Sequence, residues 1–121
     1  MHILIVEDDE NIAKMIETCL DIAAYETTVC SDGNEALSTI CANNFDLILL
    51  DVMLPGMDGF EIMEHIQSRE IPVIFLSALE NVCDKVKGLR LGGEDYIVKP
   101  FEPMELLTRI EVVLRRVNKG Q

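Results

Sequence analysis

The sequence predicts an α/β fold in which helices cover both faces of a parallel sheet. Short apolar runs alternate with segments of helical periodicity along the whole chain. Most of the runs lack an apolar/polar alternation, which indicates strands buried on both faces, as in parallel sheets flanked by helices. The length of 121 residues suits one domain, which we expect over residues 1–117, with a polar tail over 118–121.

The first elements in the chain are a buried strand, a helix and an edge strand. The apolar run 3–6 is the first predicted strand. Over 12–23, apolar residues recur every three or four positions, which predicts an amphipathic helix. The run 27–30 is more polar and suits the edge of the sheet, and Asp32 followed by Glu35 resembles a capping box that opens the second helix.

The middle of the chain repeats this alternation. The run 47–50 is wholly apolar, so we place its strand in the interior of the sheet. Asp58 precedes a third helical segment and is a residue type that caps helices. The run 73–76 is again apolar and predicts the fourth strand.

The last third of the chain supplies two helices and one strand. A fourth helix precedes the strand predicted at 96–98 and contains Gly88. This glycine either lowers the stability of its helix or permits close packing, and the sequence favours neither. Pro103 begins the fifth helix, whose apolar face continues to Val117. The result is five strands and five helices in alternation.

The charge and the cysteines exclude several classes of function. Acidic residues outnumber basic residues 22 to 10, a formal net charge of −12, so we expect this chain to bind neither nucleic acid nor a membrane directly. It has no signal peptide and no apolar stretch long enough to span a bilayer, which favours a cytoplasmic location. The cysteines are widely spaced and are expected to be reduced core residues; they are Cys19, Cys30, Cys41 and Cys83.

Chemically active side chains follow four of the predicted strands. Glu7, Asp8 and Asp9 come after the first, Asp51 after the third, Ser77 after the fourth and Lys99 after the fifth. The carboxyl ends of parallel strands meet at one edge of the sheet, where ligands bind in open α/β folds. We therefore expect these side chains to lie close together, with three or four carboxylates among them.

The predicted cluster has the chemistry of a phosphoryl site. Carboxylates brought together repel one another unless a cation neutralises them, and oxygen ligands alone favour Mg²⁺ or Mn²⁺. Lys99 adds a second positive charge and Ser77 a hydroxyl donor. Asp51 ends the central strand, so it is the best-placed nucleophile for a phosphoryl group. Each residue alone has an ordinary interpretation as a surface or capping group, but four strand ends with the required chemistry favour a site.

Three other phosphate-binding architectures fit the sequence less well. No G-x-x-x-x-G-K-[ST] string of a P-loop nucleotide enzyme is present. A flavin-binding fold needs phosphate-cradling hydroxyls after the first strand, where this chain has acidic residues. Haloacid-dehalogenase phosphatases carry a second aspartate two positions after the nucleophile, where this chain has Met53.

Four segments together resemble the receiver domain of two-component response regulators. They are residues 3–9, residues 49–59, residues 71–74 with 77–78, and residues 95–101. The resemblance covers essentially the whole chain and implies a flavodoxin-like sheet with strand order 2-1-3-4-5. It also implies that Asp51 accepts a phosphoryl group from a phosphohistidine of a sensor histidine kinase.

The resemblance assigns further roles around Asp51. Asp8 would hold Mg²⁺ directly, Glu7 through water, and Met53 through its backbone carbonyl. Asp9 lies one position past the acidic pair and is interpreted as a helix-start acid. Lys99 would contact the phosphoryl group, and the peptide bond between Lys99 and Pro100 is expected to be cis.

The resemblance also implies a conformational switch. The Ser77 hydroxyl would turn toward the phosphoryl group, and Tyr96 would then rotate inward into the space behind it. That rotation would reshape the surface formed by the fourth helix, the fifth strand and the fifth helix.

The last third of the chain is most similar to the OmpR/PhoB branch, whose receivers precede a winged-helix DNA-binding domain. In that branch, phosphorylated receivers dimerise through this surface. The expected pairs across a homodimer are Lys85 with Glu105, Asp95 with Arg109, and Arg90 with Glu111. The third pair has its charges reversed relative to our expectation for the branch, which would disfavour mixed dimers, although ordinary surface charge is the alternative interpretation.

Two functions follow, neither of them that of a turnover enzyme. In the first, residues 118–121 begin a linker to a DNA-binding domain absent from this chain, and the domain regulates transcription. In the alternative, the chain is a stand-alone response regulator that acts by binding a protein partner.

Overall fold

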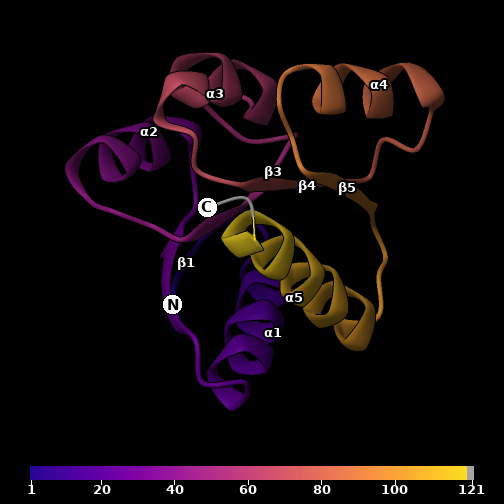
Figure 1. The fold of residues 1–121 in the computed structure, drawn as a ribbon. Coiled ribbons are helices and arrows are strands. Elements are labelled where there is room, and N and C mark those ends of the chain that lie inside the picture. The colour runs from indigo at the N-terminus through magenta and orange to yellow at the C-terminus, as the bar shows by residue number, and fades with distance from the viewer. Residues whose placement is uncertain (120–121) are drawn as a thin grey trace.

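A five-stranded parallel sheet with strand order β2-β1-β3-β4-β5 forms the centre of the computed structural model, which describes residues 1–119 (Figure 1). The strands are β1 (His2–Val6), β2 (Glu26–Cys30), β3 (Leu47–Asp51), β4 (Val73–Ser77) and β5 (Asp95–Val98). The helices are α1 (Glu10–Ile22), α2 (Gly33–Ala42), α3 (Gly59–Ile66), the short 3₁₀ helix η1 (Gln67–Arg69), α4 (Val82–Arg90) and α5 (Pro103–Lys119). The predicted fold class and strand order are confirmed.

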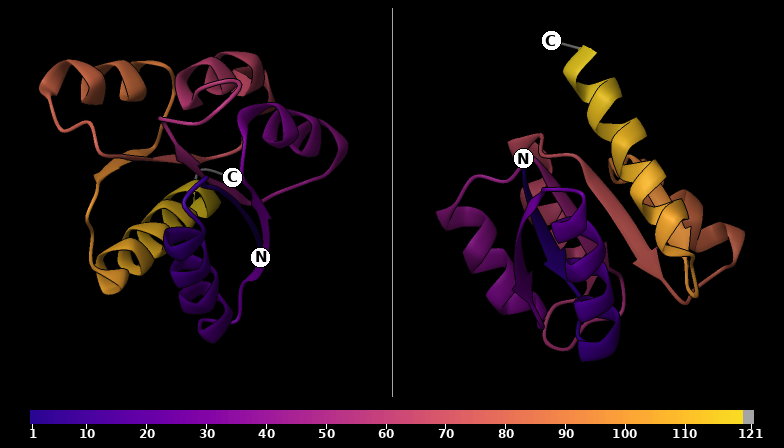
Figure 2. Two further views of the ribbon diagram at one scale, coloured as in Figure 1. Left: turned by 180° about the vertical axis from the view of Figure 1, so that it is seen from behind. Right: turned by 90° about the horizontal axis from the view of Figure 1, so that it is seen from below.

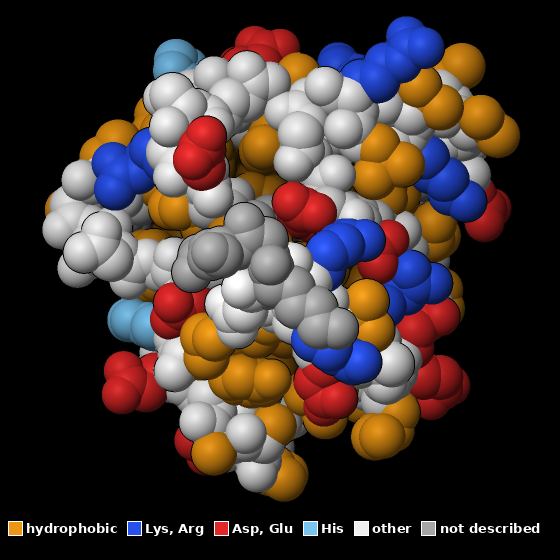
Figure 3. Space-filling model, in the orientation of Figure 1, with side chains coloured by type: hydrophobic (Ala, Val, Ile, Leu, Met, Phe, Trp, Pro, Cys, Tyr) orange, Lys and Arg blue, Asp and Glu red, His pale blue; other side chains and the backbone are white. Residues whose placement is uncertain are grey.

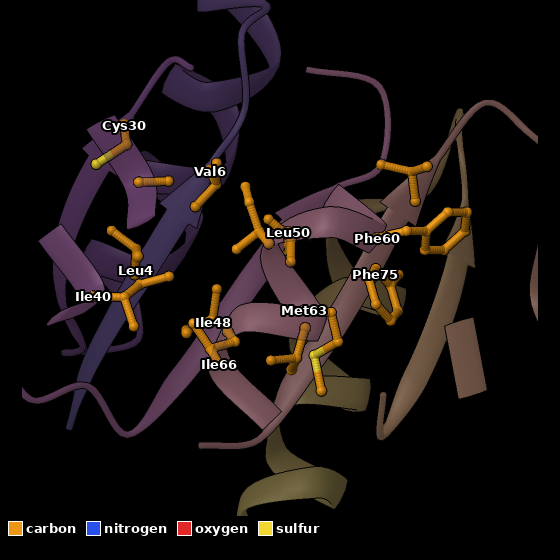
Figure 4. Packing of buried hydrophobic residues seen from close by; sticks show 14 of the residues in the cluster. Leu4, Val6, Cys30, Ile40, Ile48, Leu50, Phe60, Met63, Ile66 and Phe75 are labelled. Carbon is orange, nitrogen blue, oxygen red and sulfur yellow. The ribbon is translucent and has the colours of Figure 1, made fainter. Parts of the chain in front are cut away.

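The helices form one layer on each face of the sheet. Helices α2, α3 and α4 cover one face, and α1 and α5 cover the other, as the two views of Figure 2 also show. Successive strand residues point to opposite faces, so each strand contributes to both sides. In β1, Leu4 and Val6 join the cluster under α2 and α3, whereas Ile3 and Ile5 join the cluster with α1 and α5. Figure 4 shows the first cluster from close by.

Side chains that precede four of the helices cap their first turns. Asp9, Asp32, Asp58 and Asn81 each accept hydrogen bonds from backbone N–H groups one turn ahead, at 2.8–3.1 Å. These donors have no acceptor within their own helix, so the caps fix where each helix begins. The predicted starts at Asp32 and Asp58 are confirmed, and so is the interpretation of Asp9 as a helix-start acid.

Two sequence expectations about the chain's periphery need correction. Helix α5 continues to Lys119, so residues 118 and 119 are helical rather than part of a tail, while residues 120–121 lie outside the described part. All four cysteines are free, but only Cys30 is buried, and Cys41 and Cys83 are exposed on α2 and α4. Among the described residues, no helix combines the length and apolar character needed to cross a bilayer.

The cap of α4 allows a test of the fold. Substitution Asn81→Ala removes the side chain that accepts the Asp84 N–H, so we expect a loss of about 1 kcal/mol in the free energy of unfolding. Urea denaturation measures the loss. The control Ser38→Ala lies on the exposed side of α2 and should change stability by less than about 0.5 kcal/mol. Equal effects of the two substitutions would contradict the capping role.

Candidate functional site

The carboxyl ends of β1, β3, β4 and β5 bring the predicted site residues to one edge of the sheet. Glu7 and Asp8 directly follow β1, and Asp51 and Ser77 are the last residues of β3 and β4. One carboxylate oxygen from each of Glu7, Asp8 and Asp51 lies within 4.8 Å of the other two. Lys99 follows β5, and its backbone N–H donates to the Ser77 carbonyl at 2.8 Å. The sheet topology thus assembles the predicted cluster.

Lys99 bridges two buried carboxylates. Its Nζ lies 2.6 Å from Glu7 Oε1 and 2.9 Å from Asp51 Oδ2. Burial by itself would lower the pKa of Lys99, but the contacts with Glu7 and Asp51 outweigh that effect and raise it. The lysine therefore remains charged and serves as the protein's own counter-ion at this edge.

Glu7 is the most perturbed acid of the site. Burial, followed by its proximity to Asp51, raises the pKa of Glu7 to about 7, although Lys99 acts in the opposite direction. Its Oε2 accepts the Asp9 N–H at 3.2 Å, whereas Oε1 is buried and receives no well-directed hydrogen bond, so its contact with Lys99 is an ion pair only. The ammonium group of Lys99 thus neutralises only part of the negative charge of the three carboxylates.

The donor set fits a hard divalent cation. Three carboxylates converge, one of them with a buried and poorly satisfied oxygen, and no cysteine or histidine belongs to the cluster. Oxygen donors with exposed Asp8 at the rim suit Mg²⁺, which keeps part of its water shell when it binds proteins. Glu7, Asp8 and Asp51 are therefore candidate ligands.

Asp51 is held in a fixed orientation. The residue is almost completely buried, and its Oδ1 accepts the backbone N–H of Met53 at 3.1 Å while Oδ2 faces Lys99. The Met53 side chain is exposed, so this residue approaches the site only through its backbone.

The peptide bond between Lys99 and Pro100, directly after β5, is cis, the form that the resemblance implies.

Ser77 and Tyr96 are connected through the backbone of Leu79, a link that the sequence does not reveal. The N–H of Leu79 donates to Ser77 Oγ at 2.9 Å, and the carbonyl of Leu79 accepts from the Tyr96 hydroxyl at 2.8 Å. The resemblance implied that Tyr96 turns inward on phosphorylation, but its ring is already buried in this structure. No side-chain signal marks Leu79 as a link, because it acts through its peptide groups.

The residues expected at a dimer interface are only partly brought together within the chain. Arg109 forms an ion pair with Asp95 at 2.9 Å and lies 3.8 Å from Glu105. The Asp95–Arg109 pair, expected between subunits, is therefore formed inside one subunit. Arg90 on α4 and Glu111 on α5 are exposed, and Lys85 on α4 is half-buried.

A parallel sheet with a buried aspartate, two further acids, a lysine and a hydroxyl at one edge defines an α/β domain with a charged polar site. Comparison with known families places it more narrowly. Residues 3–111 match the family described as the response regulator receiver domain, and the chain belongs to this family.

The relatives agree with this assignment. The chain is 46% identical over 118 residues to a probable transcriptional regulator, ycf27, of Cyanidium caldarium, covering 97% of this chain and 47% of the relative. It is 44% identical over 117 residues to the transcriptional regulatory protein YkoG of Bacillus subtilis, covering 95% and 51%. The chain thus spans about half the length of these relatives.

Solved structures show the same fold. The receiver domain of the Francisella response regulator 1452 superposes with a TM-score of 0.91 at 38% identity, covering 96% of this chain and 98% of that one. A CheY-like receiver domain protein of Methanospirillum hungatei gives 0.94 at 30% identity, covering 99% and 98%.

The bridging position of Lys99 allows a test. Substitution Lys99→Met leaves Glu7 and Asp51 buried without their cation, so we expect the free energy of unfolding to fall by about 3 kcal/mol. Because Mg²⁺ would replace the missing charge, saturating Mg²⁺ should stabilise this variant more than it stabilises the wild type. Thermal unfolding with and without Mg²⁺ measures both effects, and an equal gain in the two proteins would contradict the compensating role.

Proposed function

We propose that this chain is a phosphorylation-dependent signalling receiver whose Asp51 accepts a phosphoryl group from a phosphohistidine of a sensor histidine kinase. A carboxylate oxygen of Asp51 attacks phosphorus, the P–N bond breaks, and its electron pair stays on the imidazole nitrogen. The product is an acyl phosphate. The observation that carries this proposal is the buried Asp51 carboxylate held between Lys99 and two further acids.

The site residues would share the charge of the reaction. Asp8 and Asp51 would hold Mg²⁺ directly, Glu7 through water, and Met53 through its backbone carbonyl; Mn²⁺ suits the same oxygen donors. When bound, the ion neutralises charge on the phosphoryl oxygens. Lys99 would supply the second positive charge, and the Ser77 hydroxyl would donate to a phosphoryl oxygen. The acyl phosphate serves as a signal, so the domain is not a turnover enzyme.

The assignment of the acceptor can be tested directly. Substitution Asp51→Asn removes the nucleophilic carboxylate, and we expect complete loss of acid-labile phosphate after incubation with a phosphorylated kinase or with phosphoramidate and Mg²⁺. Intact-protein mass spectrometry measures the added phosphoryl group. Asp9→Asn is the matched control because Asp9 caps α1 at the same edge and asparagine preserves the cap. Continued labelling of the Asp51 variant would refute the choice of acceptor.

The hydrogen bonds around Leu79 supply a route from the site to α4. Leu79 connects Ser77 to Tyr96, as described above, and the Tyr96 ring packs against Gly88. A β-carbon at Gly88 would lie 3.2 Å from Tyr96 and 3.1 Å from Phe75, so of the two interpretations of this glycine the structure favours close packing. Gly88 is also the only buried residue of α4. A shift of Ser77 or Tyr96 would therefore act on α4 at Gly88, its one buried contact with the core.

The surface of α4, β5 and α5 is the face through which we expect two copies to pair. Residues 1–80 contain 16 acidic and 2 basic side chains, whereas residues 81–121 contain 6 acidic and 8 basic ones. Figure 3 shows much of the blue surface over α4 and α5. Five large apolar side chains are also exposed on these helices: Val82, Val86, Leu89, Met104 and Val112. Two strongly acidic bodies would repel each other least when these faces meet.

Three ion pairs would be available across such a dimer. They are Lys85 with Glu105, Asp95 with Arg109, and Arg90 with Glu111. Asp95 and Arg109 already pair within one chain, so they would be shared or exchanged. The pair of Arg90 with Glu111 is the more selective probe, since both side chains are exposed.

Dimerisation on activation gives a further prediction. We expect sedimentation equilibrium to show a shift from monomer to dimer when Mg²⁺ and beryllofluoride, a phosphoryl mimic, are added. The charge reversal Arg90→Glu should weaken that dimer, and the double variant Arg90→Glu, Glu111→Arg should restore it, because the exchanged charges attract again. A wild type that stays monomeric would refute the proposed dimer. If the double variant fails to dimerise again, only the pairing of Arg90 with Glu111 is refuted.

For the output, we infer control of transcription through a winged-helix DNA-binding domain not present in these 121 residues. The names of the relatives and their roughly twofold greater length support this inference. Four free cysteines fit a reducing cytoplasm. The alternative, a stand-alone regulator that binds a protein partner, would follow if the gene's reading frame ended near Gln121.

A further inference from the structure

The segment between β3 and α3 carries part of the candidate site but has no regular structure of its own. It comprises residues 52–58, called the acceptor loop below. Its Met53 N–H donates to Asp51 Oδ1, and near its far end the Gly59 N–H donates to the Val52 carbonyl at 2.8 Å. The orientation of the Asp51 carboxylate therefore depends on where this loop lies.

The first turn of α2 contacts the acceptor loop through the backbone of Gly33. The Gly33 N–H donates to the Pro55 carbonyl at 3.1 Å. A β-carbon at Gly33 would lie 1.8 Å from the Met57 carbonyl oxygen and 2.7 Å from its carbonyl carbon, distances that real β-carbons do not reach. Glycine is thus required at this position because a side chain would clash with the Met57 carbonyl. Between Pro55 and Met57, Gly56 has a positive φ of 82° and turns the loop toward Asn34 of α2.

Helix α2 is the firmer of the two partners. Ala36 and Ile40 are completely buried in the core, and Asp32 caps the helix through the Glu35 N–H at 2.8 Å. The Gly33 N–H belongs to the first turn and has no acceptor within the helix, so the Pro55 carbonyl satisfies a donor that would otherwise need water. The start of the helix therefore supplies a donor that fixes the position of the Pro55 carbonyl.

We propose that Gly33 is a positioning residue for the phosphoacceptor site. Its lack of a side chain lets α2 hold the turn at 55–57, which in turn sets the position of Met53 beside Asp51. This role rests on the proposed function, in which Met53 also offers its carbonyl to Mg²⁺.

Substitution Gly33→Ala tests the proposal. The added methyl group must displace the Met57 carbonyl and break the hydrogen bond to Pro55, so the acceptor loop moves. We expect Mg²⁺ to bind about tenfold more weakly, the usual size of effect when a group that supports a metal ligand is lost. Mg²⁺ titration followed by the NMR shift of the Met53 amide measures the dissociation constant without any phosphorylation.

Gly93→Ala is the matched control. A β-carbon there would lie 2.6 Å from the Phe75 ring, so this variant also suffers a steric clash, but in the connection from α4 to β5. We expect both variants to lose stability and only Gly33→Ala to lose Mg²⁺ affinity. A dissociation constant for Gly33→Ala within twofold of the wild type, or an equal loss in both variants, would overturn the proposal.

Hydrogen exchange of the wild type provides a measurement that does not depend on a folded variant. If α2 and the acceptor loop are coupled, saturating Mg²⁺ should slow exchange of the Gly33 amide more than that of the Glu35 amide, whose acceptor is the Asp32 side chain. Equal slowing of exchange at the two amides would contradict the positioning role of Gly33. A wild type that binds no Mg²⁺ would overturn the proposed metal site together with this role, whereas normal wild-type binding with an unaffected Gly33→Ala variant would overturn the role alone.

Discussion

The ion pair of Lys99 with the buried carboxylates of Glu7 and Asp51 is the interaction on which the site depends. Two carboxylates at the edge of an apolar sheet lose their hydration, and the rise of the Glu7 pKa to about 7 records that cost. The compensating charge comes from the end of β5, two strands away from β3. The order β2-β1-β3-β4-β5 places these strand ends at one edge of the sheet, so the charge compensation depends on the topology.

The sequence was sufficient for those parts of the molecule in which residue type and position along a strand decide the outcome. Wholly apolar runs identified the interior strands, and the polar residue after each run identified the edge where Asp51, Ser77 and Lys99 meet. Asp32 and Asp58 also carry their information locally, since a capping side chain acts within one turn of its own position.

The sequence was insufficient where backbone groups or packing distances decide the outcome. Leu79 links Ser77 to Tyr96 through its N–H and carbonyl, which every residue except proline possesses. The role of Gly88 depends on two aromatic rings from different strands, so its sequence neighbours could not distinguish helix weakening from close packing. Cys41 and Cys83 were misplaced for a related reason: a small apolar residue on a helix has no marker of which face it occupies.

Under the proposed function, α4 is the element through which a charge on Asp51 would reach a distant surface. Each of the other α-helices buries at least two apolar side chains, but α4 buries only Gly88, while Val82, Val86 and Leu89 are exposed. Burial of apolar area is the main source of helix anchoring, so α4 has few contacts to oppose a displacement. Gly88 packs against the Phe75 and Tyr96 rings. Tyr96 is hydrogen-bonded to Leu79, which is hydrogen-bonded to Ser77 at the end of β4, the strand next to β3. Under the proposed function, a weakly anchored helix whose core contact is connected to the site would convert a small movement of Ser77 into a change of the α4 surface.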